Sequence, residues 1–180
     1  METAEKIKWV VDPTHSEVHF KVKHLVISTV TGTFKVFSGS LETENENFTN
    51  AEIEFSLDVN SVDTNQQQRD EHLRSADFFD AEKFKEIHFT GNTYKQVEAG
   101  HYELYGDLTI KEIKKQIKLD VEFGGVIKDP WGNDKAIFNI EGKINRKDWG
   151  LNWNAALEAG GFLVSDDVWI NCEVQLVKRT

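Results

Sequence analysis

Hydrophobic and polar residues alternate along most of this chain. Between residues 17 and 24, Val18, Phe20 and Val22 alternate with charged or imidazole side chains. The alternation recurs in four further segments, which are 51–62, 114–123, 136–144 and 167–176, and it is noisier in the last two. A period of two gives a strand one apolar and one polar face, whereas a strand covered on both faces would be a continuous apolar run. The pattern therefore predicts antiparallel strands with one wet face.

Turn-forming residues separate these runs. They occur at Gly32 and at 37–40, 44–50, 98–100, 129–134 and 159–161. Clusters of Gly, Asn, Asp and Pro favour short connections between strands. About eight strands joined by short polar loops are typical of an antiparallel barrel or sandwich, so the predicted fold class is all-β.

One long connection, from Ser61 to Phe84, interrupts the strand pattern. Good helix formers follow Asp63 and Thr64, either of which would serve as an N-cap. We therefore predict one or two helical turns within 63–79.

Part of this connection, RDEHLRSADFFD at 69–80, runs from charged residues straight into two phenylalanines. We interpret it as a short helix and turn packed at one end of the barrel. Leu73, Phe78 and Phe79 would face inward and close the tube, while the charged half would face water. Since a ligand must pass any such closure, the segment is also the predicted entrance lid.

The charge balance narrows the classes of function. The 180 residues include 31 acidic and 21 basic ones, a formal net charge of -10, which disfavours nucleic acids and anionic membrane surfaces as partners. The single cysteine, Cys172, provides neither a disulfide nor a cysteine metal cluster. The N-terminal segment has no apolar run long enough for a signal peptide or a membrane span, so we expect a cytoplasmic protein without stable membrane insertion.

Three motifs connect the chain to a known family. They are His15–Ser16 ahead of an alternating strand, the cluster Arg69-Asp70-x-His72-Leu73 ending in Phe78–Phe79, and Asn145-Arg146-x-Asp148-Trp149-Gly150. With these motifs the chain resembles the YceI-like family of lipocalin-like, polyisoprenoid-binding proteins over residues 9–178. The resemblance implies an extended eight-stranded antiparallel barrel with a lipid chain in its lumen. We expect an N-terminal tail, 1–8, and a single barrel domain, 9–180.

The chain departs from the family pattern at three places. Glu112-Ile113-Lys114 stands where the family usually has Gly-x-Thr, Lys85 where it has Pro, and Ser165 where it tends to have Gly. These differences concern the shape of one barrel rim, and with it the selection of ligand there. Many members carry an export signal, so a periplasmic or secreted location is expected if such a signal has been removed.

The dimensions of such a barrel suit a long hydrocarbon chain. Strands of about 11 residues at ~3.3 Å rise, tilted by roughly 35–45°, enclose a lumen on the order of 25–30 Å tall. Burying ~20 methylene-sized groups at about 0.8 kcal/mol each gives roughly 16 kcal/mol before the cost of immobilisation. The dimensions indicate only the character of the ligand, and the resemblance to the family implies its identity: a quinone tail or a polyprenyl phosphate, held non-covalently for storage, transport or shielding. No cofactor besides this lipid is expected.

The predicted lumen residues are inward-facing strand positions, the aromatic half of the 69–80 segment and two tryptophans. They are Phe20, Val22, His24, Phe55, Leu57, Leu73, Phe78, Phe79, Phe89, Leu108, Ile110, Leu119, Val121, Phe123, Phe138, Ile140, Trp149, Trp153 and Ile170. An ordinary packed core is the alternative interpretation of the apolar positions. For His24 the alternatives are a structural hydrogen bond and a polar contact to the ligand.

Three polar residues, Arg69, His72 and Arg146, are candidates for the rim or for contacts with a lipid head group. We expect Asp70 to pair with an arginine and so tie the helix to the barrel. Arg146 would either pair with Asp148 or another carboxylate, or meet a charged or quinone head group.

Metal binding and catalysis find little support in the sequence. His15 and His19 would share one strand face about 13 Å apart, too far to bind one metal ion. Asp70 and His72 as an acid–base pair would point apart on a helix, and neither a nucleophile motif nor a P-loop occurs. We therefore predict no metal site and no enzymatic activity, and keep an enzyme acting on a lipid substrate as the third hypothesis.

Trp149 and Trp153 carry the second hypothesis, a carbohydrate-binding β module in which two exposed rings at a rim stack against a glycan. Exposed strand edges and rim aromatics are also compatible with a homodimer.

Overall fold

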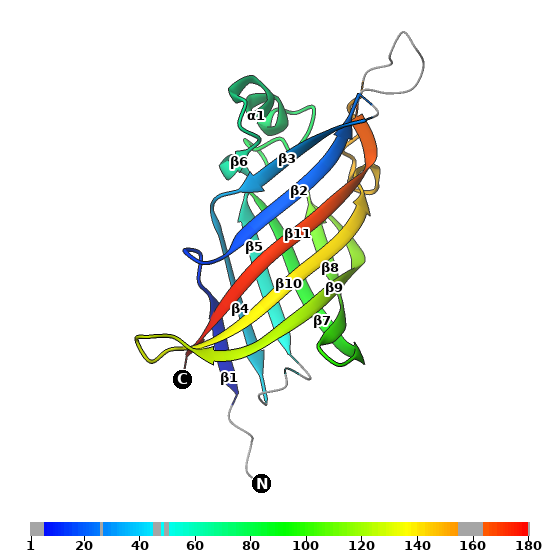
Figure 1. The fold of residues 1–180 in the computed structure, drawn as a ribbon. Helices are drawn as coiled ribbons and strands as arrows, with labels where there is room; N and C mark the ends of the chain where they lie inside the picture. Colours follow the sequence, from blue (N-terminus) through cyan, green and yellow to red (C-terminus); the bar gives the residue numbers. More distant parts are fainter. Residues whose placement is uncertain (1–5, 26, 45–47, 49–50, 155–163, 180) are drawn as a thin grey trace.

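Antiparallel strands make up most of the structure, a computed structural model that describes residues 6–25, 27–44, 48, 51–154 and 164–179 (Figure 1). The strands are β1 (Ile7–Val11), β2 (Glu17–His24), β3 (Ser28–Phe34), β4 (Phe37–Thr43), β5 (Glu52–Asp58), β6 (Val62–Asp63), β7 (Glu86–Glu98), β8 (His101–Ile110), β9 (Ile113–Lys128), β10 (Asp134–Asn145) and β11 (Val164–Arg179). The helical elements are the 3-10 turns η1 (Val59–Ser61) and η2 (Arg146–Trp149) and the helix α1 (Gln67–Arg74).

Eight of these strands close into a barrel. Hydrogen-bonded neighbours follow the order β1-β4-β5-β7-β8-β9-β10-β11, and β11 returns to pair with β1. Each of these neighbouring pairs is antiparallel. The predicted eight-stranded antiparallel barrel with one short helix is therefore confirmed.

The two ends of the barrel are built differently. Along β11, residues 176–179 pair with β1, whereas residues 164–173 pair with β2. β2 is followed by β3 and β6, and α1 lies at the same end of the molecule (Figure 1). We call this the α1 end, and the opposite one, where β1 and the C-terminus lie, the β1 end.

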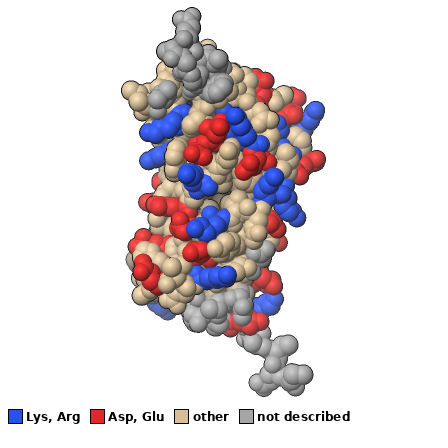
Figure 2. Space-filling model, turned by 90° about the vertical axis from the view of Figure 1, so that its right-hand side faces the viewer, with Lys and Arg blue, Asp and Glu red and all other residues tan. Residues whose placement is uncertain are grey.

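The outward faces of the strands carry charges of both signs, as the alternation predicts. On β9, for example, exposed Lys118 and Asp120 flank the buried Leu119. Figure 2 shows basic and acidic side chains interspersed over one side of the molecule. The apolar faces of the same strands point into the barrel and form the core.

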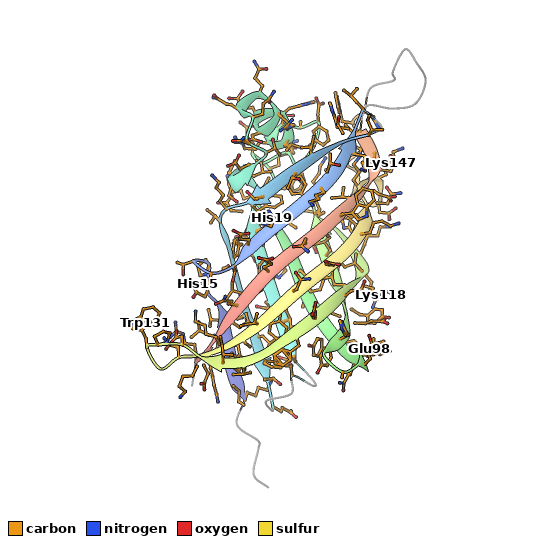
Figure 3. The ribbon with its side chains drawn as sticks, viewed as in Figure 1. His15, His19, Glu98, Lys118, Trp131 and Lys147 are labelled. Carbon is orange, nitrogen blue, oxygen red and sulfur yellow. The ribbon has the colours of Figure 1, made fainter. Side chains whose placement is uncertain are left out.

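Several local predictions need correction. Gly32 and the segment 37–40 lie inside β3 and β4 rather than in turns, because a glycine within a strand can give room to a neighbouring ring: Gly32 pairs with Phe20. His15 lies in the loop between β1 and β2, not on a strand face with His19 (Figure 3).

The other predicted boundaries fall as follows. The turns at 98–100 and 129–134 do separate β7 from β8 and β9 from β10. The turn at 159–161 and most of 44–50 lie outside the described residues. β1 already begins at Ile7, within the segment assigned to the tail, and pairs with β4; the domain boundary stays a prediction.

Helix α1 begins later than the sequence suggests. Its N-cap is Gln66, whose side-chain oxygen accepts a hydrogen bond from the backbone N–H of Arg69 at 2.5 Å. The expected cap Asp63 instead belongs to β6, which pairs with β3. Because Val62 and Asp63 form strand β6, the helix starts only at Gln67.

A hydrogen-bond cluster around Thr64, rather than the expected Asp70–arginine pair, joins α1 to the barrel. The buried Asp70 carboxylate accepts from the backbone N–H and the hydroxyl of Thr64, at 2.8 and 2.5 Å. Arg69 donates to the hydroxyl and the carbonyl of the same threonine, at 2.7 and 2.6 Å. Thr64 follows β6 directly, so the helix is anchored to that strand.

A buried ion pair fixes the loop between β1 and β2 (residues 12–16). Asp12 lies 2.5 Å from the Nζ of Lys135 on β10, and their side chains are 15% and 8% exposed. Burial alone would raise the pKa of Asp12, but hydrogen bonds from Lys135, Thr14 and His15 hold that pKa well below its ordinary value. The ionised carboxylate therefore stabilises the fold.

The β8–β9 hairpin turn contains two residues in a strained conformation. Lys111 and Glu112 have φ values of 52° and 66° between the paired Ile110 and Ile113. Two-residue turns of this kind favour Asn-Gly, since most L-residues lose energy at positive φ. The double substitution Lys111→Asn and Glu112→Gly should raise the free energy of unfolding by about 1 kcal/mol, as measured by urea denaturation. An unchanged or lowered midpoint would contradict this assignment of the turn.

Candidate functional site

A cavity of about 510 Å³ occupies the α1 end of the barrel. Its wall is almost wholly apolar and is formed by inward-facing residues of the strands, by α1 and by the turn that follows it. Predicted site residues on this wall are Phe20, Val22, His24, Leu57, Arg69, His72, Leu73, Phe78, Phe79, Leu108, Ile110, Arg146, Trp153 and Ile170. The structure thus brings together residues 18–34, residues 144–170 and the 69–80 segment, which are far apart in the sequence.

The remaining predicted lumen residues do not line this cavity. Phe55, Val121, Phe138 and Ile140 border a separate void of about 70 Å³ toward the β1 end. Phe89, Leu119, Phe123 and Trp149 line neither space. The expectation of one tall, continuous lumen is therefore wrong, because bulky side chains fill the barrel between the two spaces.

Aromatic side chains fill the β1 end. Phe48 is 1% exposed, and its ring centroid lies 5.2 Å from that of Phe123 and 5.4 Å from that of Phe138. Trp9 packs against the same Phe48 at 5.4 Å. Phe123 and Phe138, which were predicted to line the lumen, are therefore packed core residues at this end of the barrel, as the alternative interpretation had it.

The turn after α1 closes the large cavity with aromatic contacts. The ring centroid of Phe78 lies 5.4 Å from that of Trp153 and 5.1 Å from that of His72. The ring centroid of Phe79 lies 6.0 Å from that of Phe34 on β3. The Nε2 atom of His72 is 2.9 Å from Asp77. His72 therefore pairs with Asp77 and not with Asp70, which bonds Thr64, so the acid–base pair considered from the sequence does not form.

Arg69 is the cation best placed to meet a polar ligand group. Two of its nitrogens bond Thr64, and its side chain borders the cavity together with Gln66 and Gln68. A guanidinium has five N–H donors. Among the described residues, two hydrogen bonds from this group are found, both to Thr64, so further donors are available to a ligand. This is the part of the wall where a phosphate or a quinone carbonyl would find donors.

Arg146, in contrast, is a structural residue. Its nitrogens donate to the carbonyls of Ser165, Leu151 and Trp153 at 2.9, 2.6 and 2.8 Å. Asp166, rather than the expected Asp148, is the nearby carboxylate, at 4.0 Å. Burial lowers the pKa of Arg146, and the backbone carbonyls compensate its charge. Arg146 is therefore held mainly by hydrogen bonds to backbone carbonyls and not, as one of the two alternatives had it, by an ion pair with Asp148.

Trp149 cannot stack on a sugar at the barrel surface. It is 2% exposed, and its indole N–H donates to the carbonyl of Leu108 at 2.9 Å. Trp153 is partly buried against the aromatic closure, with its ring 4.6 Å from that of His72. The exposed pair of tryptophans on which the carbohydrate-binding hypothesis rested is therefore absent at these two positions.

Part of the cavity wall is formed by residues that the sequence pattern did not predict. The additional apolar residues are Val18, Val30, Phe34, Ile87, Ile144, Leu151, Val164 and Val168. Two of them could have been predicted, because Val18 and Val168 lie two residues from Phe20 and Ile170 on the same strand faces. Leu151 follows the 3-10 turn η2, and Val164 is the first residue of β11, so neither lies within a run whose periodicity marks it.

Two further properties of the described residues bear on the site. They contain no group of three or more His, Cys, Asp or Glu side chains with the geometry to hold a metal ion. Over the same residues, none of the helices has the length and hydropathy needed to span a membrane.

Cys172 provides a chemical probe of the barrel interior. It lies on β11 with the inward parity of Ile170 and Val174, and burial raises the pKa of its thiol to about 12. A thiol of ordinary pKa would have about a thousandfold more thiolate at pH 8. We expect its alkylation by N-ethylmaleimide to be at least a hundredfold slower in the folded protein than in urea, as followed by mass spectrometry. Equal rates would contradict its inward position.

The comparisons with known proteins agree with this architecture. A family model described as YceI-like domain matches residues 9–176. A UPF0312 protein of Staphylococcus epidermidis is 38% identical over 162 residues, which are 89% of this chain and 92% of that protein. The crystal structure of a Campylobacter jejuni YceI protein has a TM-score of 0.75 at 33% identity, over 89% of this chain and 91% of that one.

A fourth comparison is more distant. A polyisoprenoid binding domain from Saccharophagus degradans, implicated in plant cell wall breakdown, has a TM-score of 0.70 at 17% identity, over 95% of this chain and 98% of that one. At this identity the likeness shows the shared barrel fold alone.

Proposed function

We propose that this chain, which belongs to the YceI-like domain family, binds one isoprenoid-type lipid non-covalently in the cavity at its α1 end. The observation that carries the proposal is the cavity itself, about 510 Å³ with an almost wholly apolar wall. This volume falls in the range of about 300–1,000 Å³ typical of ligand sites. The polyisoprenoid-binding name of the Saccharophagus domain supports the choice of lipid class.

The volume also sets the energetic scale. With about 30 Å³ for each methylene-sized group, taken equal to the share of a water molecule, the cavity holds roughly 17 such groups. At about 0.8 kcal/mol each, their burial contributes on the order of 14 kcal/mol before the costs of association. Such a complex is tight but reversible, as storage, transport or shielding of a lipid requires.

In this proposal the lipid head lies at the α1 end, near Arg69. Among the described residues, only Thr64 accepts hydrogen bonds from the guanidinium of Arg69. Its other N–H donors suit a phosphate or a quinone carbonyl, because arginine forms strong hydrogen bonds with such oxygens. Arg146 is not assigned this role, since its donors are engaged by backbone carbonyls. His72 pairs with Asp77 and contributes its ring to the aromatic closure.

A lipid carrier is favoured over the two other hypotheses. An apolar wall offers little to the hydroxyl groups of a sugar, and Trp149 is engaged inside the barrel. The separate engagement of Asp70 and His72 removes the acid–base pair that motivated an enzyme. We therefore propose a binding protein without catalytic activity of its own.

The test is extraction of the purified protein into organic solvent, followed by mass spectrometry of the extract. We expect close to one long-chain lipid per protein molecule. The matched control is Val22→Trp, which places an indole in the cavity from the wall of β2 and should leave the protein folded but depleted of lipid. A wild-type extract without lipid, combined with failure to take up any added prenyl lipid, would contradict the proposal.

A further inference from the structure

The interior of the barrel narrows to a waist between the large cavity and the small void. On β5, Leu57 borders the cavity, whereas Ile53 borders the void. Phe55, which lies between them, pairs across the sheet with Phe89 of β7. Leu119 on β9 lies against Gly142 of β10, which stands between Ile140 at the void and Ile144 at the cavity. We define the waist as Phe55, Phe89 and Leu119.

Each waist side chain lies over a glycine of a neighbouring strand. A Cβ atom added at Gly39 would lie 2.5 Å from the ring of Phe55, and one added at Gly106 would lie 2.5 Å from the ring of Phe89. One added at Gly142 would lie 2.5 Å from Leu119. No larger residue fits at these places without moving the waist side chain, so the glycines hold each one in position.

The waist is packed as well as positioned. Phe89 and Leu119 are 9% and 8% exposed, and the ring of Phe55 stacks on that of Phe37 with centroids 5.8 Å apart. Below it, the void of about 70 Å³ has room for only about two methylene-sized groups. Leu57 on β5 and Ile87 on β7 border the cavity next to Phe55 and Phe89. A chain that enters from the α1 end therefore lies against Leu57 and Ile87, and the waist behind them keeps it from going further.

We propose that the waist is a floor that limits the bound hydrocarbon chain to about three isoprene units, the length that roughly 17 methylene-sized groups of space accept. This inference rests on the proposed function and adds its chain-length selectivity. The excess of a longer chain stays outside the α1 end and adds little affinity. Phe55 is the determining residue, because it borders the void directly.

The test is a binding series with linear prenyl alcohols of two to six isoprene units, measured by competition with a fluorescent prenyl analogue. For the wild type, each added unit should tighten binding at least tenfold up to the third unit, and further units should change it less than twofold. Phe55→Ala joins the cavity to the void and should move this limit to four or five units. Phe55→Leu, a milder change, should move it by about one unit.

Phe123→Ala is the matched control. It removes a phenylalanine that stacks on Phe138 with centroids 5.0 Å apart, on the far side of the waist and in contact with neither space, so it should keep the wild-type limit. Affinity that rises steadily to six units in the wild type, or a limit that is the same in Phe55→Ala and the wild type, would overturn the floor while leaving lipid binding intact. Absence of binding for every alcohol would instead overturn the proposed function.

Discussion

Replacing Phe78 and Phe79 together by alanine should destabilise the protein by about 4–8 kcal/mol and accelerate lipid release more than tenfold. Loss of a buried phenylalanine costs about 3–5 kcal/mol. Phe78 is buried and Phe79 only partly buried, so the loss of Phe79 costs less, and both rings belong to the closure of the cavity. Phe78 contacts Trp153 and His72, and Phe79 contacts Phe34. Without these contacts the closure opens more often, and opening limits the exit of a buried ligand.

Release is measured by loading a fluorescent polyisoprenoid analogue and following its transfer to acceptor vesicles. Because the double variant loses a large share of the stability of an ordinary domain, the milder Phe79→Leu serves as a second variant, with a smaller acceleration. Phe123→Ala at the β1 end controls for loss of stability alone and should release lipid at the wild-type rate. A folded Phe78/Phe79 variant with an unchanged release rate would show that this turn is only a brace and that lipid passes elsewhere.

Asp12→Asn should lower the free energy of unfolding at pH 7 by about 3–5 kcal/mol, because it leaves the ammonium of Lys135 buried without its counter-charge. Asparagine retains an oxygen for the N–H of Thr14, which bonds the Asp12 side chain at 3.0 Å. The change therefore isolates the charge.

The dependence on pH follows from the lowered pKa of Asp12. A carboxylate whose pKa is depressed in the folded state adds stability above its ordinary pKa of about 3.9, and this contribution is lost as the pH falls. The difference between wild type and Asp12→Asn, measured by urea denaturation, should be constant from about pH 5 to pH 8 and shrink below about pH 4. Glu52→Gln, which breaks the exposed pair with Lys6, should cost less than about 1 kcal/mol. A difference for Asp12→Asn that does not change with pH would contradict the ion-pair explanation.

Strand periodicity predicted most of the fold. Alternation around Val18, Phe20 and Val22 correctly gave the inward face of β2, because the side-chain period of a strand is a local property. The placement of Leu73, Phe78 and Phe79 at one end of the barrel also followed from the sequence. The charged half of the 69–80 segment favours water, so its aromatic half was expected to pack against the barrel.

The division of the interior could not be predicted in this way. Periodicity tells which side of a strand a residue occupies, but it does not tell how much of the lumen its side chain fills. Phe55 and Leu57 have the same parity on β5, yet one lies at the waist and the other borders the cavity. The difference depends on Gly39, which comes from another strand and admits the ring of Phe55.

The polar residues were harder to assign than the apolar ones. Arginines were expected to meet carboxylates, but Arg146 bonds the backbone carbonyls of Leu151 and Trp153 after η2 and of Ser165 at the start of β11. Asp70 likewise bonds the backbone and hydroxyl of Thr64. Backbone groups outside regular strands need partners when they are buried, and the sequence does not show which side chain will provide them.

The most direct test of the central claim is to locate a bound lipid in the barrel. A prenyl phosphate of three isoprene units with bromine at its far end, co-crystallised at equimolar concentration, would place that end by anomalous diffraction. We predict one bromine site inside the barrel, within contact distance of Leu57 and Ile87 on the α1 side of the waist, with the phosphate near Arg69. A bromine site on the outer surface, or a chain that runs past the waist toward Phe48, would contradict this account.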